Sequence, residues 1–259
     1  MTKTAAILVI GDEILSGRTR DSNSGHIAGV LNGLGITLRE IRVVGDEQQH
    51  IVAALNALRG AYDMVFTTGG IGPTHDDITA DAVAMAFGVG IDLHPEAFQM
   101  LAARYKPGEF NTARQRMARI PLGAALIPNP VSVAPGFHIG NVYVMAGVPA
   151  VMHAMLDQVV PQLPRGAPPL AITIESGVAE GAIAQGLGAI QAGEPDVTIG
   201  SYPFYRQDGT GEAVQGVQLV ARGHDGEKVE RAAAAIEALL RDLGAASQRI
   251  KAVVPGDQA

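Results

Sequence analysis

Apolar runs that alternate with helix-patterned segments constrain the fold of this chain more than any other sequence feature. Residues 5–10, Ala-Ala-Ile-Leu-Val-Ile, are apolar without interruption, which is typical of a strand buried on both faces of a parallel sheet. Further strands are predicted at 36–44, 62–68, 124–127 and 142–145. Because helical patterns separate the strands, we expect an α/β fold in three layers, with helices covering both faces of a parallel sheet.

Prolines mark a change of pattern in the second half of the chain. They are Pro161, Pro164, Pro168 and Pro169. Beyond them the sequence predicts a smaller unit of strands and two helices, at 179–191 and 226–242. We therefore expect a first domain at 1–165, a small α+β domain at 170–247 and a flexible tail at 248–259.

Composition excludes several classes of protein. The 259 residues carry a net charge of −7, and a nucleic-acid partner requires a basic face, so none is expected. The absence of cysteine excludes disulfides, zinc–thiolate sites and a cysteine nucleophile. No apolar stretch reaches the length of a membrane span. These features predict a soluble cytoplasmic protein that does not associate with membranes.

A glycine-rich turn follows the strand predicted at 62–68. Gly69, Gly70 and Gly72 precede a helix predicted at 75–87. Successive backbone N–H groups in such a turn can bind an anion, and the start of a helix adds positive potential. The turn follows a strand's carboxyl end, where open α/β sheets bind ligands. It is neither a Walker A loop nor a Gly-x-Gly-x-x-Gly fingerprint, and the alternative is a tight turn without a ligand.

Acidic residues come directly after these glycines. Asp77 and Asp81 are four residues apart, so they would share one face of the predicted helix, while Asp76 would point elsewhere, toward the ligand. Carboxylates at this position can hold Mg²⁺ against a phosphate. Alternatively, Thr74 and Asp77 form a capping box, and the acids complement the helix dipole.

Two other predicted strands also end in acids. Asp12 and Glu13 follow Gly11, and Asp46 follows Gly45. Since the ends of parallel strands meet at one rim of a sheet, we expect Asp12, Glu13 and Asp46 to approach Asp77. Clustered carboxylates repel one another unless a cation lies among them, which predicts a metal site of these four residues. The alternative is ordinary turn composition.

Other side chains are candidate ligand contacts. Asn23 either donates to the ligand or caps a helix, and Thr74 lies in the glycine turn itself. Pro-rich segments predict a rigid loop at 128–137, from which Asn129 can close the pocket through its amide, as Gly147 can through its backbone. The alternative for both is a purely structural loop. Further helices are predicted at 95–105 and 110–119, and one or two of their basic side chains can steer an anionic ligand.

The motif Gly-Gly-x-Gly-Pro-Thr-x-Asp-Asp-x-Thr at 69–79, together with Gly-Asp-Glu at 11–13, resembles a known family. It resembles the molybdopterin-binding domain of molybdenum-cofactor biosynthesis proteins, and most of all the N-terminal part of competence/damage-inducible protein A, the CinA-like branch. The resemblance covers residues 4–160 and continues at 199–203, which is similar to the second domain of that branch. Asp76 favours this branch, because the molybdopterin-inserting branch usually has Arg there.

The resemblance implies an activity and assigns residues to it. The CinA-like branch is known for metal-dependent hydrolysis of nucleotide diphosphates such as ADP-ribose and FAD, with Mg²⁺, Mn²⁺ or Co²⁺ and with K⁺. Asp46 and Asp77 match its metal-associated acids, and the glycines at 69, 70 and 72 match its phosphate turn. We therefore expect Asp46, Asp76 and Asp77 to be catalytic. The resemblance also implies a homo-oligomer, either a dimer or a trimer.

The chain departs from the family pattern at two turns. Val131-Ser132-Val133 stands where the family usually has Val-Gly-Thr, and Val151 stands where the Gly-Val-Pro-x-Glu-Met turn has Glu. The loss of this Glu favours an alternative function, the non-hydrolytic binding of molybdopterin or a pterin nucleotide. A third hypothesis is an assembly protein in which the domain serves oligomerisation.

Overall fold

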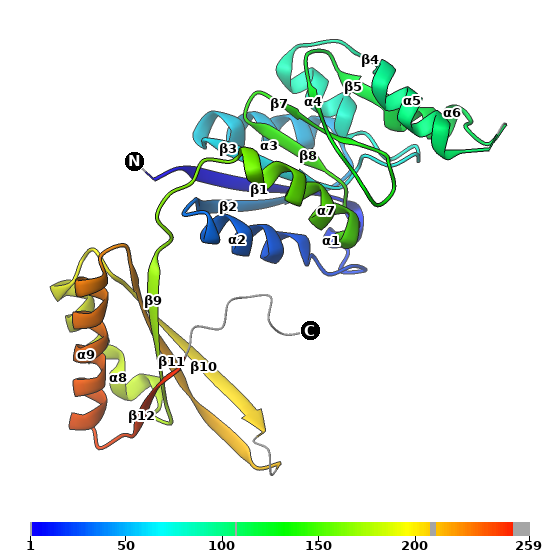
Figure 1. Ribbon diagram of the computed structural model, residues 1–259. Helices are drawn as coiled ribbons and strands as arrows, with labels where there is room; N and C mark the ends of the chain where they lie inside the picture. The colour runs from blue at the N-terminus through cyan, green and yellow to red at the C-terminus, as the bar shows by residue number, and fades with distance from the viewer. Residues whose placement is uncertain (1, 107, 208–210, 251–259) are drawn as a thin grey trace. The chain divides into compact units, whose positions relative to one another are not determined.

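The chain divides into two compact units, Met1–Gly166 and Ala167–Ala259. The computed structural model describes residues 2–106, 108–207 and 211–250 (Figure 1). Each unit has its own sheet and its own apolar core. The sequence predicts a boundary between residues 165 and 170, in the same proline-containing stretch.

A six-stranded mixed sheet, in the order β2-β1-β3-β8-β7-β6, forms the centre of the first unit. The strands are β1 (Thr4–Ile10), β2 (Thr37–Val44), β3 (Met64–Thr68), β6 (Ala125–Ile127), β7 (Gly136–Ile139) and β8 (Val142–Met145). The first three and β8 are parallel, but β7 runs antiparallel to both of its neighbours. Strand β7 begins in a segment where the sequence predicts a loop. The two-residue connection from β7 to β8 is too short for a crossover, so the strands form a hairpin.

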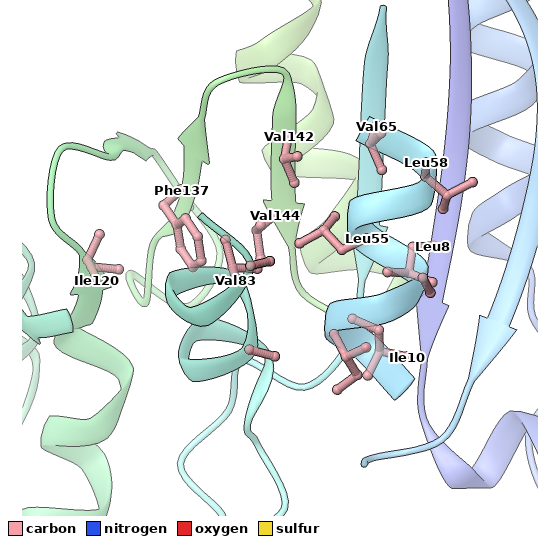
Figure 2. Close-up of a cluster of buried hydrophobic side chains, with 14 of the residues drawn as sticks. Leu8, Ile10, Leu55, Leu58, Val65, Val83, Ile120, Phe137, Val142 and Val144 are labelled. Atoms are coloured by element: carbon pink, nitrogen blue, oxygen red, sulfur yellow. The ribbon is translucent and has the colours of Figure 1, made fainter. Parts of the chain in front are cut away.

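Helices cover both faces of this sheet, which confirms the three layers (Figure 1). The helices α2 (Asn23–Gly33) and α7 (Pro149–Val159) pack on one face, and α3 (Gln48–Ala61) and α4 (Thr79–Phe87) pack on the other. Side chains of β1 alternate between the two cores. Figure 2 shows Leu8 and Ile10 in the core under α3 and α4, whereas Ile7 and Val9 belong to the core under α2 and α7. Burial on both faces explains the unbroken apolar run.

Helix α4 begins at Thr79, not at residue 75. Residues 75 and 76 form a turn, and 77 and 78 are irregular, so Asp76 and Asp77 precede the helix. The helix predicted at 110–119 is likewise replaced by shorter elements. The remaining elements of the unit are α1 (Asp12–Leu15), β4 (Ile91–Leu93), α5 (Pro95–Arg104), α6 (Thr112–Gln115), the 3₁₀ turns η1 (Arg116–Ala118) and η2 (Val160–Gln162), and β5 (Arg119–Pro121), which pairs with β4.

The second unit is a four-stranded antiparallel sheet with two helices, in the strand order β10-β11-β9-β12. Its elements are β9 (Leu170–Ser176), α8 (Glu180–Gly193), β10 (Thr198–Gln207), β11 (Ala213–Gly223), α9 (Gly226–Asp242) and β12 (Ser247–Ile250). Strand β12 includes residues 248–250, which the sequence assigns to a tail. The rest of that tail, 251–259, lies outside the described residues. No helix in the described part of the chain is long and apolar enough to cross a membrane.

Candidate functional site

Four acidic side chains line a cleft at the carboxyl ends of β1, β2 and β3. Asp12 and Glu13 come from the segment after β1, Asp46 follows β2, and Asp76 belongs to the turn after β3. The cleft has a volume of about 590 Å³, and Ser16, Arg18, His75 and Ile78 complete its lining. The structure thus brings together three of the acids that the sequence places at the rim and adds Asp76. Asp77 is not part of this lining.

Backbone hydrogen bonds lock the first two acidic loops together. The N–H of Asp12 donates to Oδ2 of Asp46 at 3.0 Å, and the N–H of Asp46 donates to Oδ1 of Asp12 at 3.3 Å. Gly45 makes this exchange possible, because a Cβ at this position would lie 2.3 Å from Oδ1 of Asp12. The exchange uses one oxygen of each carboxylate, so the second oxygen of each can turn toward a ligand.

Burial and the neighbouring carboxylates both act on the pKa of Asp46. Burial raises this pKa above its ordinary value, and the charges of Asp12, Glu13 and Asp76 raise it further, although the hydrogen bond from the Asp12 backbone acts in the opposite direction. The carboxylates therefore create a negative potential that a bound cation would relieve.

The donor chemistry of the cleft suits a hard divalent cation, but the protein does not supply a complete ligand set. Within residues 2–106, 108–207 and 211–250, no three His, Asp or Glu side chains converge closely enough to hold a metal ion. Mg²⁺ commonly binds through one or two carboxylates and takes its other ligands from substrate phosphates and water. The acids of the cleft fit this mode of binding, in which the protein supplies only one or two carboxylates.

The glycine turn is tightly packed against the ends of β1 and α4. Gly69 has a φ of 102°, and a Cβ there would lie 2.1 Å from the carbonyl oxygen of Ile10. Gly70 has a φ of 67°, and its Cβ would lie 2.2 Å from Oγ1 of Thr79. That hydroxyl donates to the carbonyl of Gly69 at 3.0 Å, and the Thr79 N–H donates to the carbonyl of Gly70 at 3.0 Å. Only glycine fits at the first two positions of the turn, and α4 holds the turn in place.

Asp77 closes the glycine turn on itself. Its Oδ2 accepts hydrogen bonds from the N–H of Thr74 at 2.7 Å and from the Thr74 hydroxyl at 2.5 Å. A Cβ on Gly72 would come within 2.6 Å of the same oxygen. Because Asp77 precedes α4, it shares no helix face with Asp81. Asp81 instead forms an ion pair with Arg119 through two hydrogen bonds, at 2.6 and 2.8 Å.

The two asparagines that the sequence indicates as ligand contacts both organise loops. Asn23 donates from Nδ2 to the carbonyl of Gly147 at 2.7 Å, and Gly147 lies against Gly69. Oδ1 of Asn23 is buried and has no partner among the described residues. Asn129 donates to Ser132 and to the carbonyl of Ala134, and accepts from the backbone of its own loop. Asn129 thus stabilises its own loop, whereas Asn23 connects α2 to the turn after β8.

Arg116 is the side chain beside the turn that the sequence does not distinguish from its basic neighbours. It lies in η1, and its Nη2 donates to the carbonyl of Asp77 at 3.2 Å. Its position depends on the packing of η1 against the glycine turn, and no local pattern marks it.

Comparison with known families shows two matches along the chain. Residues 6–165 match the family described as the probable molybdopterin binding domain. Residues 168–249 match the middle domain of FAD synthase. The two matches meet where the structure divides into its two units.

Individual relatives agree with this result. A CinA-like protein of Citrifermentans bemidjiense is 41% identical over 201 residues, which are 73% of this chain and 49% of that protein. A Caldivirga maquilingensis protein is 41% identical over 165 residues, 61% of this chain and 64% of that protein. The chain therefore spans about half to two thirds of these relatives. The crystal structure of the CinA protein of Thermoplasma acidophilum, whose function is given as unknown, aligns with a TM-score of 0.59 at 33% identity, over 62% of this chain and 98% of that one.

Proposed function

Since the chain belongs to the molybdopterin-binding domain family, with CinA-like relatives, we propose that it is a metal-dependent nucleotide pyrophosphatase acting on ADP-ribose or FAD-like dinucleotides. Family membership, together with the match of the second unit to the middle domain of FAD synthase, is consistent with a nucleotide-related function. The hydrolytic activity, its metal and its substrates are the parts that we propose.

One observation carries the proposal: four carboxylates face a common cleft next to a glycine turn at the carboxyl ends of three strands. Backbone N–H groups of such a turn suit the phosphate oxygens of the ligand, although the N–H of Gly69 itself donates to the carbonyl of Met145 at 3.2 Å. The carboxylates suit a cation bridging those phosphates. A diphosphate with its counter-cation needs both features within a few ångströms of each other.

The roles of the residues follow from their positions. Asp46 and Asp12 would hold the cation, Mg²⁺, Mn²⁺ or Co²⁺, with their outward oxygens, and the cation would supply positive charge to the diphosphate. A water molecule attacks one phosphorus, the bridging P–O bond breaks, and the water's proton passes to a carboxylate of the cleft.

Asp77 has a different role in this proposal. It maintains the glycine turn through Thr74 and stays outside the acidic cleft. K⁺ as an additional cofactor and a homo-oligomer of two or three chains also belong to the proposal, and both rest on the resemblance to the CinA-like branch. A cytoplasmic location completes it and rests on the sequence features described above.

A nucleotide panel tests the proposal. We expect the protein to release AMP from ADP-ribose or FAD in the presence of Mg²⁺, Mn²⁺ or Co²⁺, with K⁺ varied, as measured by chromatography. Asp46→Asn should lower turnover by about 100-fold or more, since it removes a charge at the reacting group. The matched control is Asp92→Asn on strand β4, away from the cleft. A folded protein that releases no AMP with any of the metals would disprove the proposal.

A second candidate function is the binding of molybdopterin or a pterin nucleotide without hydrolysis. Val151, which replaces the family's Glu, packs against the apolar core under α7. An apolar side chain at this position supplies no ligand for a cation. Fluorescence titration with a pterin, followed by product analysis, distinguishes the two candidates: tight binding without any product favours this second function.

A further inference from the structure

A second, much smaller cavity lies beside the glycine turn. The segment 70–78 borders both cavities, since His75, Asp76 and Ile78 line the acidic cleft, whereas Gly70, Gly72 and Asp77 line the small cavity. The small cavity also contacts η1 and the Pro135 loop, and its volume is about 20 Å³. This is room for one water molecule or one ligand oxygen.

Arg116 lines this cavity and carries a buried donor that has no partner among the described residues. Its Nε is buried and has no hydrogen-bond partner in the part of the chain that the structure describes. Its Nη2 is held at 3.2 Å by the carbonyl of Asp77, the residue that closes the glycine turn. A buried guanidinium N–H without an acceptor is costly, typically by about 1–3 kcal/mol or more. The guanidinium is thus held in place while one of its N–H groups, that of Nε, has no acceptor.

Neighbouring arginines already have other partners. Arg119 lines the same cavity, but its guanidinium is paired with Asp81 through two hydrogen bonds. Arg114 lies over the ring of Tyr105 and donates to the carbonyl of Glu109. Among these three arginines, Arg116 is the one whose buried donor has no partner in the described residues.

We infer that Arg116 is a binding residue for the phosphate group of the ligand. One phosphate oxygen enters the small cavity and accepts from the guanidinium of Arg116, while the cation-binding acids line the other cavity, which the same segment borders. The ligand would then be bound by groups of opposite charge: the guanidinium would bind the phosphate, and the carboxylates would bind its counter-cation. This inference rests on the proposed function, because it requires a ligand with a phosphate at the glycine turn.

Isothermal titration calorimetry with ADP-ribose in EDTA tests the inference, because binding is then measured without cation and without turnover. Arg116→Gln would remove a charge-assisted hydrogen bond to the phosphate, so we expect it to weaken ADP-ribose binding about 10-fold or more. The salt dependence of the dissociation constant should also become smaller. Adenosine, which has no phosphate, should bind both proteins equally. Arg114→Gln is the matched control and should bind ADP-ribose like the wild type.

The remaining outcomes are distinguishable. Unchanged affinity in Arg116→Gln would overturn the inference and leave a water molecule as the occupant of the cavity. If Arg116→Gln does not fold, Arg116→Lys keeps the charge but lacks the planar Nε donor, and we expect it to bind several-fold more weakly. Wild-type affinity in Arg116→Lys would then overturn the inference. Failure of the wild type to bind in EDTA, with AMP release once metal is added, would overturn it while the proposed function stands.

Discussion

At the scale of single residues, the acidic cleft lowers the stability of the folded protein while it provides carboxylates that can bind a cation. The raised pKa of Asp46 means that the folded protein binds more protons than the unfolded chain between about the ordinary pKa of 3.8 and the raised value. Stability from this group therefore declines as pH rises through that window, and the full penalty applies above it.

Asp46→Asn should remove this penalty. The amide oxygen can still accept from the Asp12 N–H, so the connection between the two loops persists. In EDTA at pH 7 we expect the unfolding midpoint to rise by roughly 1–3 °C, and the difference from wild type should vanish at pH values below the window. Thermal denaturation followed by circular dichroism measures this. An unchanged or lowered midpoint at pH 7 would show that the carboxylates do not repel one another.

The turn glycines are required for two separate reasons, which can be measured apart. Gly69→Ala combines a positive φ, worth about 1–2 kcal/mol of strain, with a clash against the Ile10 carbonyl, so we expect a loss above about 3 kcal/mol. Gly88 at the end of α4 also has a positive φ, but nothing lies within 4 Å of its added Cβ. Gly88→Ala should cost only about 1 kcal/mol in urea denaturation. Equal losses of unfolding free energy in Gly69→Ala and Gly88→Ala would show that the clash with the Ile10 carbonyl has no effect on stability.

At the scale of elements, α2 and α7 are joined by a stacked pair of histidines. The rings of His26 and His153 have centroids 3.6 Å apart. The pKa of His26 is lowered, first by burial and then by His153, while Asp157 on α7 acts in the opposite direction. The folded protein therefore binds fewer protons than the unfolded chain below the ordinary pKa of 6.5, and stability should fall as pH drops from there through the lowered value.

His26→Phe tests this pH dependence. It retains a flat ring against His153 but cannot be protonated, so the unfolding midpoint should fall less between pH 7 and pH 5 than in the wild type. His50→Gln, at an exposed position in α3, serves as the control. The histidine pair has no part in acid sensitivity if His26→Phe and the wild type lose the same number of degrees.

At the scale of the whole molecule, the two units have separate cores. The first unit buries two clusters on either face of its sheet, and the second buries its own cluster under α8 and α9. We expect a chain of residues 1–166 to fold by itself, with cooperative thermal unfolding. Limited proteolysis of the full chain should cut in the stretch around residues 164–169. A fragment without a cooperative transition would contradict this expectation.

Much of the fold can be predicted from the sequence, because burial on two faces leaves an unbroken apolar run and burial on one face leaves a periodic one. The strand at 5–10 and the helix ending near Asp242 are examples. The antiparallel β7 could not be predicted, since Gly136 and Phe137 follow prolines in a segment with loop composition. The start of α4 was also misplaced, because Asp76 and Asp77 are typical of a first helical turn, and only the tertiary contacts of Thr79 set the boundary.

The sequence by itself determined which residue types meet at the rim of the sheet, because parallel strands must end on the same side and the glycines and acids follow those ends directly. Only the tertiary structure decided how these residues divide: Asp76 lines the acidic cleft, Asp77 turns to Thr74, and Arg116 approaches the glycine turn from η1. The physical reason is that side-chain direction in a turn depends on the hydrogen bonds that close it. Sequence spacing offers the Thr74–Asp77 pair only as one alternative, and it does not relate Arg116 to the carbonyl of Asp77 at all.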